Sequence, residues 1–304
     1  MRIVRERDSG RVRASIRAVL PAVVALVLFV GASTLVGGLL GAGMATATAG
    51  LVFVLLAFNS ALYAALTAGA LRGAAWLDRR PWRAFGFHVD RRWLRNVVAG
   101  GAISLVAVGV SVGYGQFRGF RAVDLGAAGV SGPGGSLVVG LVVVGFLVMS
   151  LLGNVFEEVL YRGIMLRNFV DGLTARGQSL RVAAAIATLA GTVLFGLYHV
   201  PLRGNVVVAV DAAVVGITFS LAYLLTGELG LALGVHAGRF PLNVLPGATL
   251  GPFEFHQVLT FSQNTLAANL EIKLVRLGLT CLLLLGWCSL FDGGVRVARS
   301  LRRE

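Results

Sequence analysis

Three charged side chains lie inside a long apolar stretch, and charged groups in such surroundings are candidates for a functional site. The stretch runs from about residue 138 to 167 and contains Glu157, Glu158 and Arg162. Placing one charged residue at the centre of a membrane helix costs about 2.5–3.5 kcal/mol. Because the three charged groups are so close in sequence, we expect them to be paired and to face protein or water rather than lipid.

The spacing of these residues indicates different roles for the two glutamates. Glu158 and Arg162 are four residues apart, so they share a helix face with the acid before the base, the better order for an ion pair. Taken alone, that pair suits a structural role as well as a catalytic one. Glu157 points about 100° away from Glu158 around the same helix. The sequence therefore predicts one carboxylate held by the arginine and a second, that of Glu157, available for other work.

Two histidines in later apolar stretches complete the set of candidate residues. If the stretches containing His199 and His236 cross the same bilayer as Glu157, the three side chains lie near one depth on three helices. An acid and two histidines in that arrangement can activate a water molecule or hold a metal ion. Taken singly, a membrane histidine more often hydrogen-bonds across a helix interface. The combination therefore favours a site more than any single residue does.

The composition indicates that most of the chain is embedded in a membrane. Its 304 residues are 57% hydrophobic and only 13% charged, whereas soluble domains carry about 25% charged residues. A helix needs about 20 apolar residues to cross a bilayer. Eight runs are candidates, at about 18–42, 48–71, 97–115, 138–167, 182–202, 205–226, 228–247 and 272–292. We therefore expect an all-α, polytopic membrane protein of about eight transmembrane helices, with residues 1–304 forming a single membrane domain.

The basic residues behind the net charge of +13 are distributed as in membrane proteins. Arginine clusters at 1–17, 72–95 and 296–303 each border an apolar run, as cytoplasmic loops beside anionic lipid do. This distribution favours membrane lipid over nucleic acid as a partner. It also predicts a multi-pass protein of the cell membrane with both termini in the cytoplasm. The arginines and aromatics of 78–93 are expected at the membrane interface. The glycine-rich segment 116–136 and the segment 248–271 are expected to be loops on the outer side.

Together, the motifs resemble those of the CAAX-processing and bacteriocin-processing intramembrane endopeptidases, which include type II CAAX prenyl endopeptidases and abortive-infection-like proteins. The matching sequences are Glu157-Glu158-Val-Leu-Tyr-Arg162, Phe195-Gly-Leu-Tyr-His199 and, on a later helix, His236. The core similarity runs from about 138 to 247. The order of the three motifs together is far more specific than the second motif alone.

The resemblance implies hydrolysis of a peptide bond in a membrane-anchored or prenylated substrate. Glu157 and His199 would activate the attacking water, and His236 would help to stabilise the oxyanion. Glu158 with Arg162 would brace the site. A glutamate base assisted by histidine accounts for hydrolysis without a metal. If a divalent cofactor such as Zn²⁺ is present, its expected ligands are Glu157, His199 and His236.

One position departs from the family's pattern. The family usually has asparagine four residues after the third-motif histidine, and here Phe240 stands there, preceded by Arg239. Asn243 follows seven residues after the histidine, beyond Pro241, which can bend a helix. The departure favours one alternative, a non-catalytic relative acting as a membrane scaffold or regulator. A transporter or proton relay is a further alternative because it also uses buried acids and histidines, although we find no inverted-repeat pattern.

Overall fold

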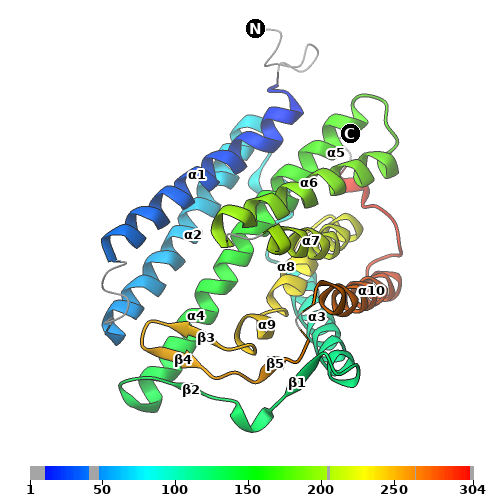
Figure 1. The fold of residues 1–304 in the computed structure, drawn as a ribbon. Helices are drawn as coiled ribbons and strands as arrows, with labels where there is room; N and C mark the ends of the chain where they lie inside the picture. Colours follow the sequence, from blue (N-terminus) through cyan, green and yellow to red (C-terminus); the bar gives the residue numbers. More distant parts are fainter. Residues whose placement is uncertain (1–10, 41–47, 204–205, 264, 302–304) are drawn as a thin grey trace.

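The computed structural model describes residues 11–40, 48–203, 206–263 and 265–301, and within them the chain is mainly helical (Figure 1). The α-helices are α1 (Ala14–Leu40), α2 (Ala49–Asp78), α3 (Arg91–Phe117), α4 (Gly135–Glu158), α5 (Arg167–Thr174), α6 (Leu180–Arg203), α7 (Val206–Thr226), α8 (Leu229–Ala237), α9 (Pro241–Val244) and α10 (Leu266–Phe291). A π-helix, η4 (Val159–Leu166), joins α4 to α5. Short 3-10 helices are η2 (Trp82–Phe85), η3 (Leu125–Ala127) and η5 (Arg299–Leu301).

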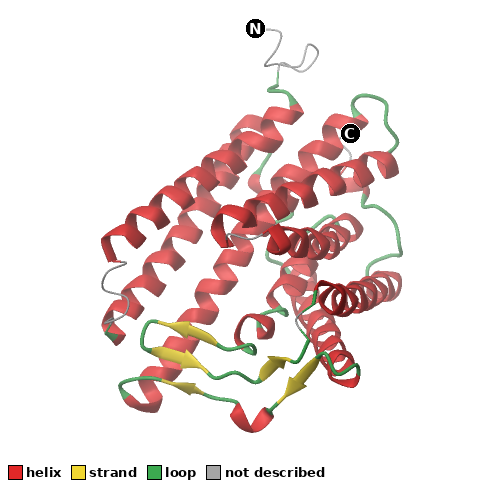
Figure 2. Cartoon of the chain, in the orientation of Figure 1, coloured by secondary structure: helices red, strands yellow, loops and turns green. Residues whose placement is uncertain are grey.

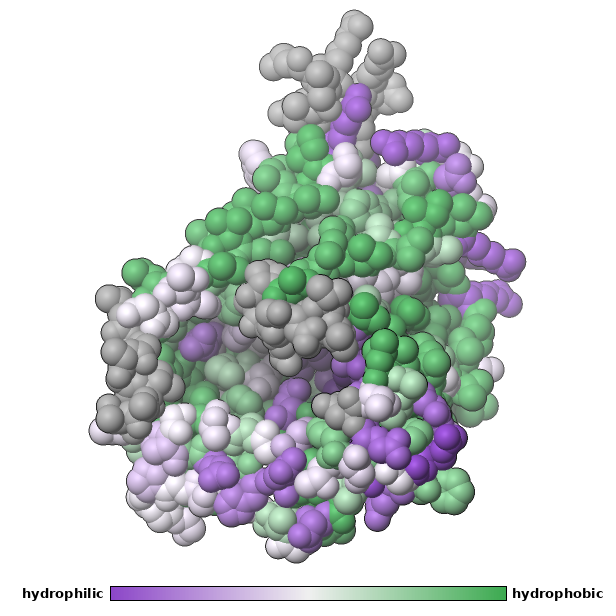
Figure 3. All heavy atoms as spheres, in the orientation of Figure 1, coloured by the Kyte–Doolittle hydropathy of each residue, from purple (hydrophilic) through white to green (hydrophobic). Residues whose placement is uncertain are grey.

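Seven helices among the described residues are long and apolar enough to cross a membrane. They are α1, α2, α3, the continuous α4–η4–α5 helix, α6, α7 and α10. Many of their leucine and valine side chains are exposed, as expected where a helix faces lipid. Figure 3 shows hydrophobic surface over α1 and α6 and more hydrophilic surface toward the strands. The predicted class, an all-α polytopic membrane protein, is confirmed.

The segment 228–247, expected as one continuous span, is instead broken into two helices. α8 has nine residues and rises only about 14 Å, too little to cross a bilayer. Pro241 begins α9, since proline fits the first turn of a helix but cannot continue the preceding one. The chain still passes from one end of the molecule to the other: Leu229 N donates to Gly86 O over 2.9 Å, and Val258 N donates to Leu245 O over 2.8 Å.

The two segments expected as outer loops pair with each other through short strands (Figure 2). The strands are β1 (Arg121–Val123), β2 (Val130–Ser131), β3 (Ala248–Leu250), β4 (Phe253–Phe255) and β5 (Leu259–Phe261). β1 pairs antiparallel with β5, Ala122 lying opposite Thr260, and β2 and β3 flank β4. Strands of two or three residues are too short to show an alternating pattern in the sequence.

Buried ion pairs hold the other end of the molecule together. Arg17 and Arg11 both donate to Asp78, and Arg17 also donates to Asp171 over 3.2 Å. Arg167 donates to the carbonyl of Ser300 over 2.8 Å. The beginning of α1, the ends of α2 and α5, and the C-terminal η5 segment therefore lie together, away from the strands (Figure 1).

The arginine-rich segment after α2, expected at the membrane interface, packs partly within the protein. Trp82 is 43% exposed, but Phe85 and Trp93 are buried. A Cβ added at Gly163 in η4 would lie 2.9 Å from the carbonyl oxygen of Phe85. The segment therefore packs against the helix that carries the charged motif and helps to fix its position.

Helices α3 and α8 approach each other backbone to backbone through a glycine face. Gly230, Gly234 and Gly238 recur every fourth residue along α8 and its C-cap. A Cβ added at Gly234 would lie 2.1 Å from the carbonyl oxygen of Val97 in α3. This small-residue packing, typical of membrane helices, fixes the helix that carries His236.

Gly234→Ala is expected to destabilise the protein by about 1–3 kcal/mol, because the added methyl group collides with backbone and the helices must separate. Thermal unfolding of the purified protein in detergent measures the loss. Gly109→Ala in α3 is the matched control, since a Cβ there meets nothing within 4 Å. Equal unfolding temperatures for the two variants would contradict close α3–α8 packing.

Candidate active site

The three residues expected to act together line one cavity. Glu157 from α4, His199 from α6 and His236 from α8 surround a space of about 160 Å³. Other residues lining it are Asn154, Phe195, Asp211, Ala212, Phe219, Arg239, Leu242 and Asn243. An acid and two histidines from three helices that are well separated in the sequence therefore share one polar cavity.

The two adjacent glutamates occupy different surroundings, as their spacing predicted. Glu158 is fully buried, and its Oε1 accepts a hydrogen bond from Arg162 Nη1 over 3.1 Å. The same oxygen lies 2.9 Å from His236 Nδ1, a contact that the sequence did not reveal. The side chain of Glu157 is 18% exposed and lines the cavity. One carboxylate is thus held within the protein, and the other is accessible.

The contact with Glu158 sets the proton arrangement of His236. A carboxylate paired with an arginine is ionised and can only accept hydrogen bonds, so His236 Nδ1 carries the proton that it donates to Glu158. Its Nε2 lies 3.9 Å from Glu157 Oε2, too far for a direct hydrogen bond. The His236 ring stacks on Phe219, with centroids 4.3 Å apart and an interplanar angle of 19°. Both contacts fix the orientation of the imidazole.

His199 is oriented by its own helix. Its Nδ1 lies 2.8 Å from the carbonyl oxygen of Phe195, four residues earlier. Since a carbonyl only accepts, Nδ1 carries the proton, and neutral His199 keeps the lone pair on Nε2. The ring also packs edge-on against Phe195, with centroids 4.8 Å apart. This explains why the second motif combines phenylalanine and histidine at a spacing of four.

Arg162 is enclosed by groups that compensate its buried charge. Besides Glu158, its guanidinium donates through Nη2 to the carbonyl of Gly216 over 3.0 Å. It lies 4.5 Å from the ring centroid of Phe195 and 5.0 Å from that of Phe219, within cation–π distance. A Cβ at Gly216 would come within 3.0 Å of Nη2, so glycine provides the space for this approach.

The first motif continues into an unusual helix. Residues 159–166 form η4, in which every residue is buried. π-helical turns are rare and often occur at functional sites, and this one begins directly after Glu158. Nothing in the apolar spacing of this stretch predicts it.

The expected metal ligands share the cavity without forming a metal site. A zinc site uses at least three protein ligands, and within the described ranges no three His, Cys, Asp or Glu side chains are grouped to hold one ion. His199 Nδ1 and His236 Nδ1 are hydrogen-bonded to protein oxygens, which leaves the Nε2 atom of each ring as the nitrogen that could bind a metal. Among the described residues, Glu157, His199 and His236 are not grouped as three ligands of one ion.

The break after α8 changes which later residues reach the cavity. Phe240 packs against Phe146 with ring centroids 5.6 Å apart and is not among the cavity-lining residues. Arg239 and Asn243 do line it, because the turn between α8 and α9 redirects the chain. Asn154 also lines the cavity. Because it lies three residues before Glu157 on the same helix face, this spacing in the sequence could have identified it as a site residue.

Comparison with known proteins identifies the segment that carries this site. Residues 139–239, about a third of the chain, match the family described as type II CAAX prenyl endopeptidase Rce1-like. No curated protein and no solved structure matches the chain. The matched segment contains all five candidate site residues: Glu157, Glu158, Arg162, His199 and His236. Through this segment, the chain is similar to the type II CAAX prenyl endopeptidase Rce1-like family.

Proposed function

We propose that this protein is an intramembrane endopeptidase that hydrolyses a peptide bond in a membrane-anchored or prenylated peptide. The observation that carries the proposal is the convergence of Glu157, His199 and His236 on one cavity. Glu158 and Arg162 lie behind them as a buried ion pair. The substrate class is inferred from the family description, which names prenyl endopeptidases.

Glu157 is the proposed general base. Its accessible carboxylate accepts a proton from water while the water oxygen attacks the peptide carbonyl carbon, giving a tetrahedral intermediate. His199 Nε2, with its free lone pair, accepts a hydrogen bond from the same water and orients it. When the carbon–nitrogen bond breaks, Glu157 returns the proton to the leaving amine. Positioned acid–base groups of this kind contribute about 10²–10⁴-fold to a rate.

Asn243 and Arg239 are the proposed donors to the oxyanion. Both side chains line the cavity and both carry N–H groups in every relevant protonation state. His236 Nε2 can donate only when the imidazole is protonated, since Nδ1 already holds the proton shared with Glu158. We therefore assign His236 a supporting role and place the main oxyanion donors after the helix break, where the family's usual asparagine position is occupied by Phe240.

A cleavage assay tests this function directly. The purified protein in liposomes should shorten a peptide bearing a thioether-linked isoprenoid near its C-terminus, as mass spectrometry would show. The same peptide without the lipid should be cleaved more slowly, since it does not partition into the bilayer. Failure to cleave either peptide would contradict the protease proposal and favour a scaffold or regulatory role.

Removing divalent ions is expected to leave cleavage unchanged. We infer this because the described residues offer no three-ligand group around the cavity, and a glutamate-activated water needs no metal. Initial rates with and without EDTA provide the measurement, after extended dialysis to remove tightly bound ions. Inhibition that Zn²⁺ reverses would instead indicate a metal-bound nucleophile.

We further propose that the protein resides in the cell membrane with both termini in the cytoplasm. The arginine clusters support this orientation, and the beginning of α1 and the C-terminal segment lie at one end of the molecule. Reporter fusions at residue 304 and within 116–135 should report opposite sides of the membrane. The same side for both would show that the chain crosses the bilayer differently.

A further inference from the structure

A groove between α1 and α2 opens on the surface that these two helices present to the bilayer. Its volume of about 450 Å³ exceeds the 160 Å³ of the candidate active-site cavity, and the two spaces have no lining residue in common. The groove is lined by aliphatic side chains, glycines, a proline and a tryptophan, and Leu20, Leu28 and Trp76 among them are exposed. A peptide held at Glu157 therefore does not fill the groove, and a separate apolar molecule is needed to do so.

Two glycines of α2 give the groove its depth. Gly69 and Gly73 both line it, and a Cβ added at either one would meet nothing within 4 Å. These glycines differ from Gly234, whose missing side chain is replaced by the backbone of α3. Atoms that line an empty space lose the dispersion contacts that a neighbour would supply. A flexible hydrocarbon chain lying in the groove restores those contacts.

The length of the groove matches one leaflet of a bilayer. Its lining residues on α1 extend from Leu20 to Leu28, and those on α2 from Ala65 to Leu77. At the rise of an α-helix these distances are about 12 Å and about 18 Å. The hydrocarbon core of a bilayer is about 30 Å thick, so each leaflet contributes about half of that. The groove therefore fits a lipid acyl chain and is too short for a membrane-spanning helix of a second copy.

An exposed cation lies on the rim of this groove. Arg72 follows Gly69 by three residues and precedes Trp76 by four, so all three side chains share one side of α2. Arg72 is exposed, and it makes no hydrogen bond, ion pair or ring contact with any residue that the structure describes. Charged side chains in membrane helices normally pair or face the protein interior. Arg72 does neither, so an anion from outside the described protein is needed to compensate its charge.

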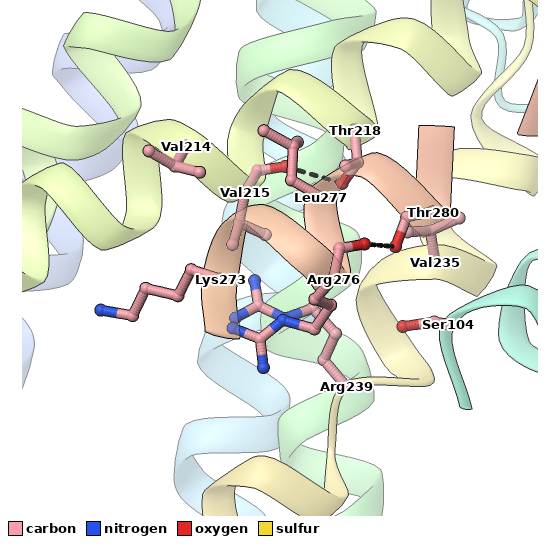
Figure 4. A pocket seen from close by; sticks show the side chains of 10 residues that line it. All are labelled: Ser104, Val214, Val215, Thr218, Val235, Arg239, Lys273, Arg276, Leu277 and Thr280. Atoms are coloured by element: carbon pink, nitrogen blue, oxygen red, sulfur yellow. Dashed lines mark hydrogen bonds between the residues drawn. The ribbon is translucent and has the colours of Figure 1, made fainter. Parts of the chain in front are cut away.

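Basic residues of the other spanning helices have different surroundings. The ammonium group of Lys273 on α10 lies 2.7 Å from Asp211. Arg276 is only 8% exposed and, with Arg239, lines a space of about 20 Å³ between helices (Figure 4). About 10–15 Å³ is what a single water molecule needs, so this enclosed space excludes a lipid. Arg72 is accessible to a headgroup, whereas these cations are enclosed by protein.

The position of Arg72 along α2 corresponds to the level of lipid phosphates. α2 has 30 residues and is about 45 Å long, about 15 Å longer than the hydrocarbon core. An even overhang at the two ends places Arg72, six residues before the end at Asp78, within about 2 Å of the hydrocarbon edge. Trp76 lies one turn further out, at the interface where tryptophan is enriched. A guanidinium there can donate two parallel hydrogen bonds to phosphate oxygens.

We propose that the groove between α1 and α2 binds one anionic phospholipid, with an acyl chain in the groove and the phosphate on Arg72. An anionic lipid is favoured over a zwitterionic one because the ammonium group of a choline headgroup already offsets the phosphate charge. In the proposed orientation the groove lies in the cytoplasmic leaflet, which carries anionic lipid. This lipid site goes beyond the proposed endopeptidase function and does not depend on it.

Native mass spectrometry of the purified full-length protein tests the headgroup contact. Phosphatidylglycerol and phosphatidylcholine with identical acyl chains are titrated separately into the detergent-solubilised protein. We expect the first bound phosphatidylglycerol to bind at least 10-fold more tightly than phosphatidylcholine, and Arg72→Gln to reduce that preference to less than 3-fold. Arg176→Gln is the matched control, because Arg176 is also exposed but does not line the groove; it should retain the full preference.

A second substitution tests the acyl-chain contact. Gly69→Leu places a side chain in the groove without meeting protein atoms at its Cβ, so it should weaken binding of both lipids at least 10-fold. Gly278→Leu on α10 is the matched control, because a Cβ there also meets nothing within 4 Å and the position is outside the groove. This control should bind both lipids as the wild-type protein does.

Several outcomes would overturn the lipid site. Equal affinity for the two lipids, or an unchanged preference in Arg72→Gln, would reject the role of Arg72. If that variant fails to fold, Arg72→Lys, which keeps the charge but loses the planar fork, should show an intermediate preference. Many equivalent lipids without one tight site would show only a general lipid shell. A dimer that Gly69→Leu dissociates, with lipid binding unchanged, would assign the groove to a second copy of the chain.

Discussion

Glu157→Gln is expected to abolish peptide cleavage while leaving the fold intact. Glutamine keeps the size of the side chain but cannot accept the proton of the attacking water, so a rate loss of about 10²–10⁴-fold follows. The Glu157 side chain is 18% exposed and has no ion-pair partner as close as that of Glu158, so its charge is dispensable for stability. Mass-spectrometric initial rates and thermal unfolding in detergent measure the two properties.

Glu158→Gln, on the neighbouring residue, is expected to lower stability as well as activity. This change weakens the hydrogen bonds to Arg162 and His236 and leaves the Arg162 charge buried without its carboxylate. Breaking a buried ion pair costs about 3–5 kcal/mol, so we expect lower yield and a lower unfolding temperature as well as lost activity. Full cleavage by Glu157→Gln, or normal stability of Glu158→Gln, would contradict the division of roles between the two glutamates.

Asn243→Ala is expected to lower turnover by about 100- to 1000-fold, the usual effect of removing one oxyanion donor. Its amide lines the cavity, and the redirected chain after Pro241 places it there. The measurement is kcat on the lipidated peptide. Leu242→Ala is the matched control, because Leu242 lines the same cavity but has no donor to lose.

Substitutions at the two preceding positions separate the possible donors. Arg239→Ala should also lower turnover, and a loss larger than that of Asn243→Ala would make Arg239 the main donor. Phe240→Asn should not raise turnover, since this side chain packs against Phe146 and lines a neighbouring space, not the cavity that contains Glu157. A clear gain from Phe240→Asn would show that α8 continues past Ala237 when substrate is bound, contrary to the structure.

Short-range spacing allowed several features of this protein to be predicted from the sequence. Long apolar runs identify the spanning helices, because a bilayer imposes a minimum length on each. The ion pair of Glu158 with Arg162 follows from a four-residue spacing, which places both side chains on one face of the helix. The orientation of His199 is also set locally, by the carbonyl of Phe195 four residues earlier, but we did not predict this contact from the sequence. These features depend on residues a few positions apart.

Other features were decided only by the tertiary structure. The contact of His236 with Glu158 and the stacking on Phe219 join three helices and have no signature in local spacing. The end of α8 at Ala237 depends on Pro241 together with the packing of a glycine face against α3, so continuous apolarity alone gave the wrong span.

The basic residues beside the cavity show the same limit most clearly. Lys273 and Arg276 are three residues apart on α10, but nothing in the sequence relates them to Arg239 or to Asp211. Their proximity arises because α8 and α10 both pack against α7, and packing depends on the fit of whole helix surfaces. The sequence by itself therefore determined which residues are charged within the membrane helices, and only the tertiary structure decided which of those charges are neutralised by one another and which are available to a ligand.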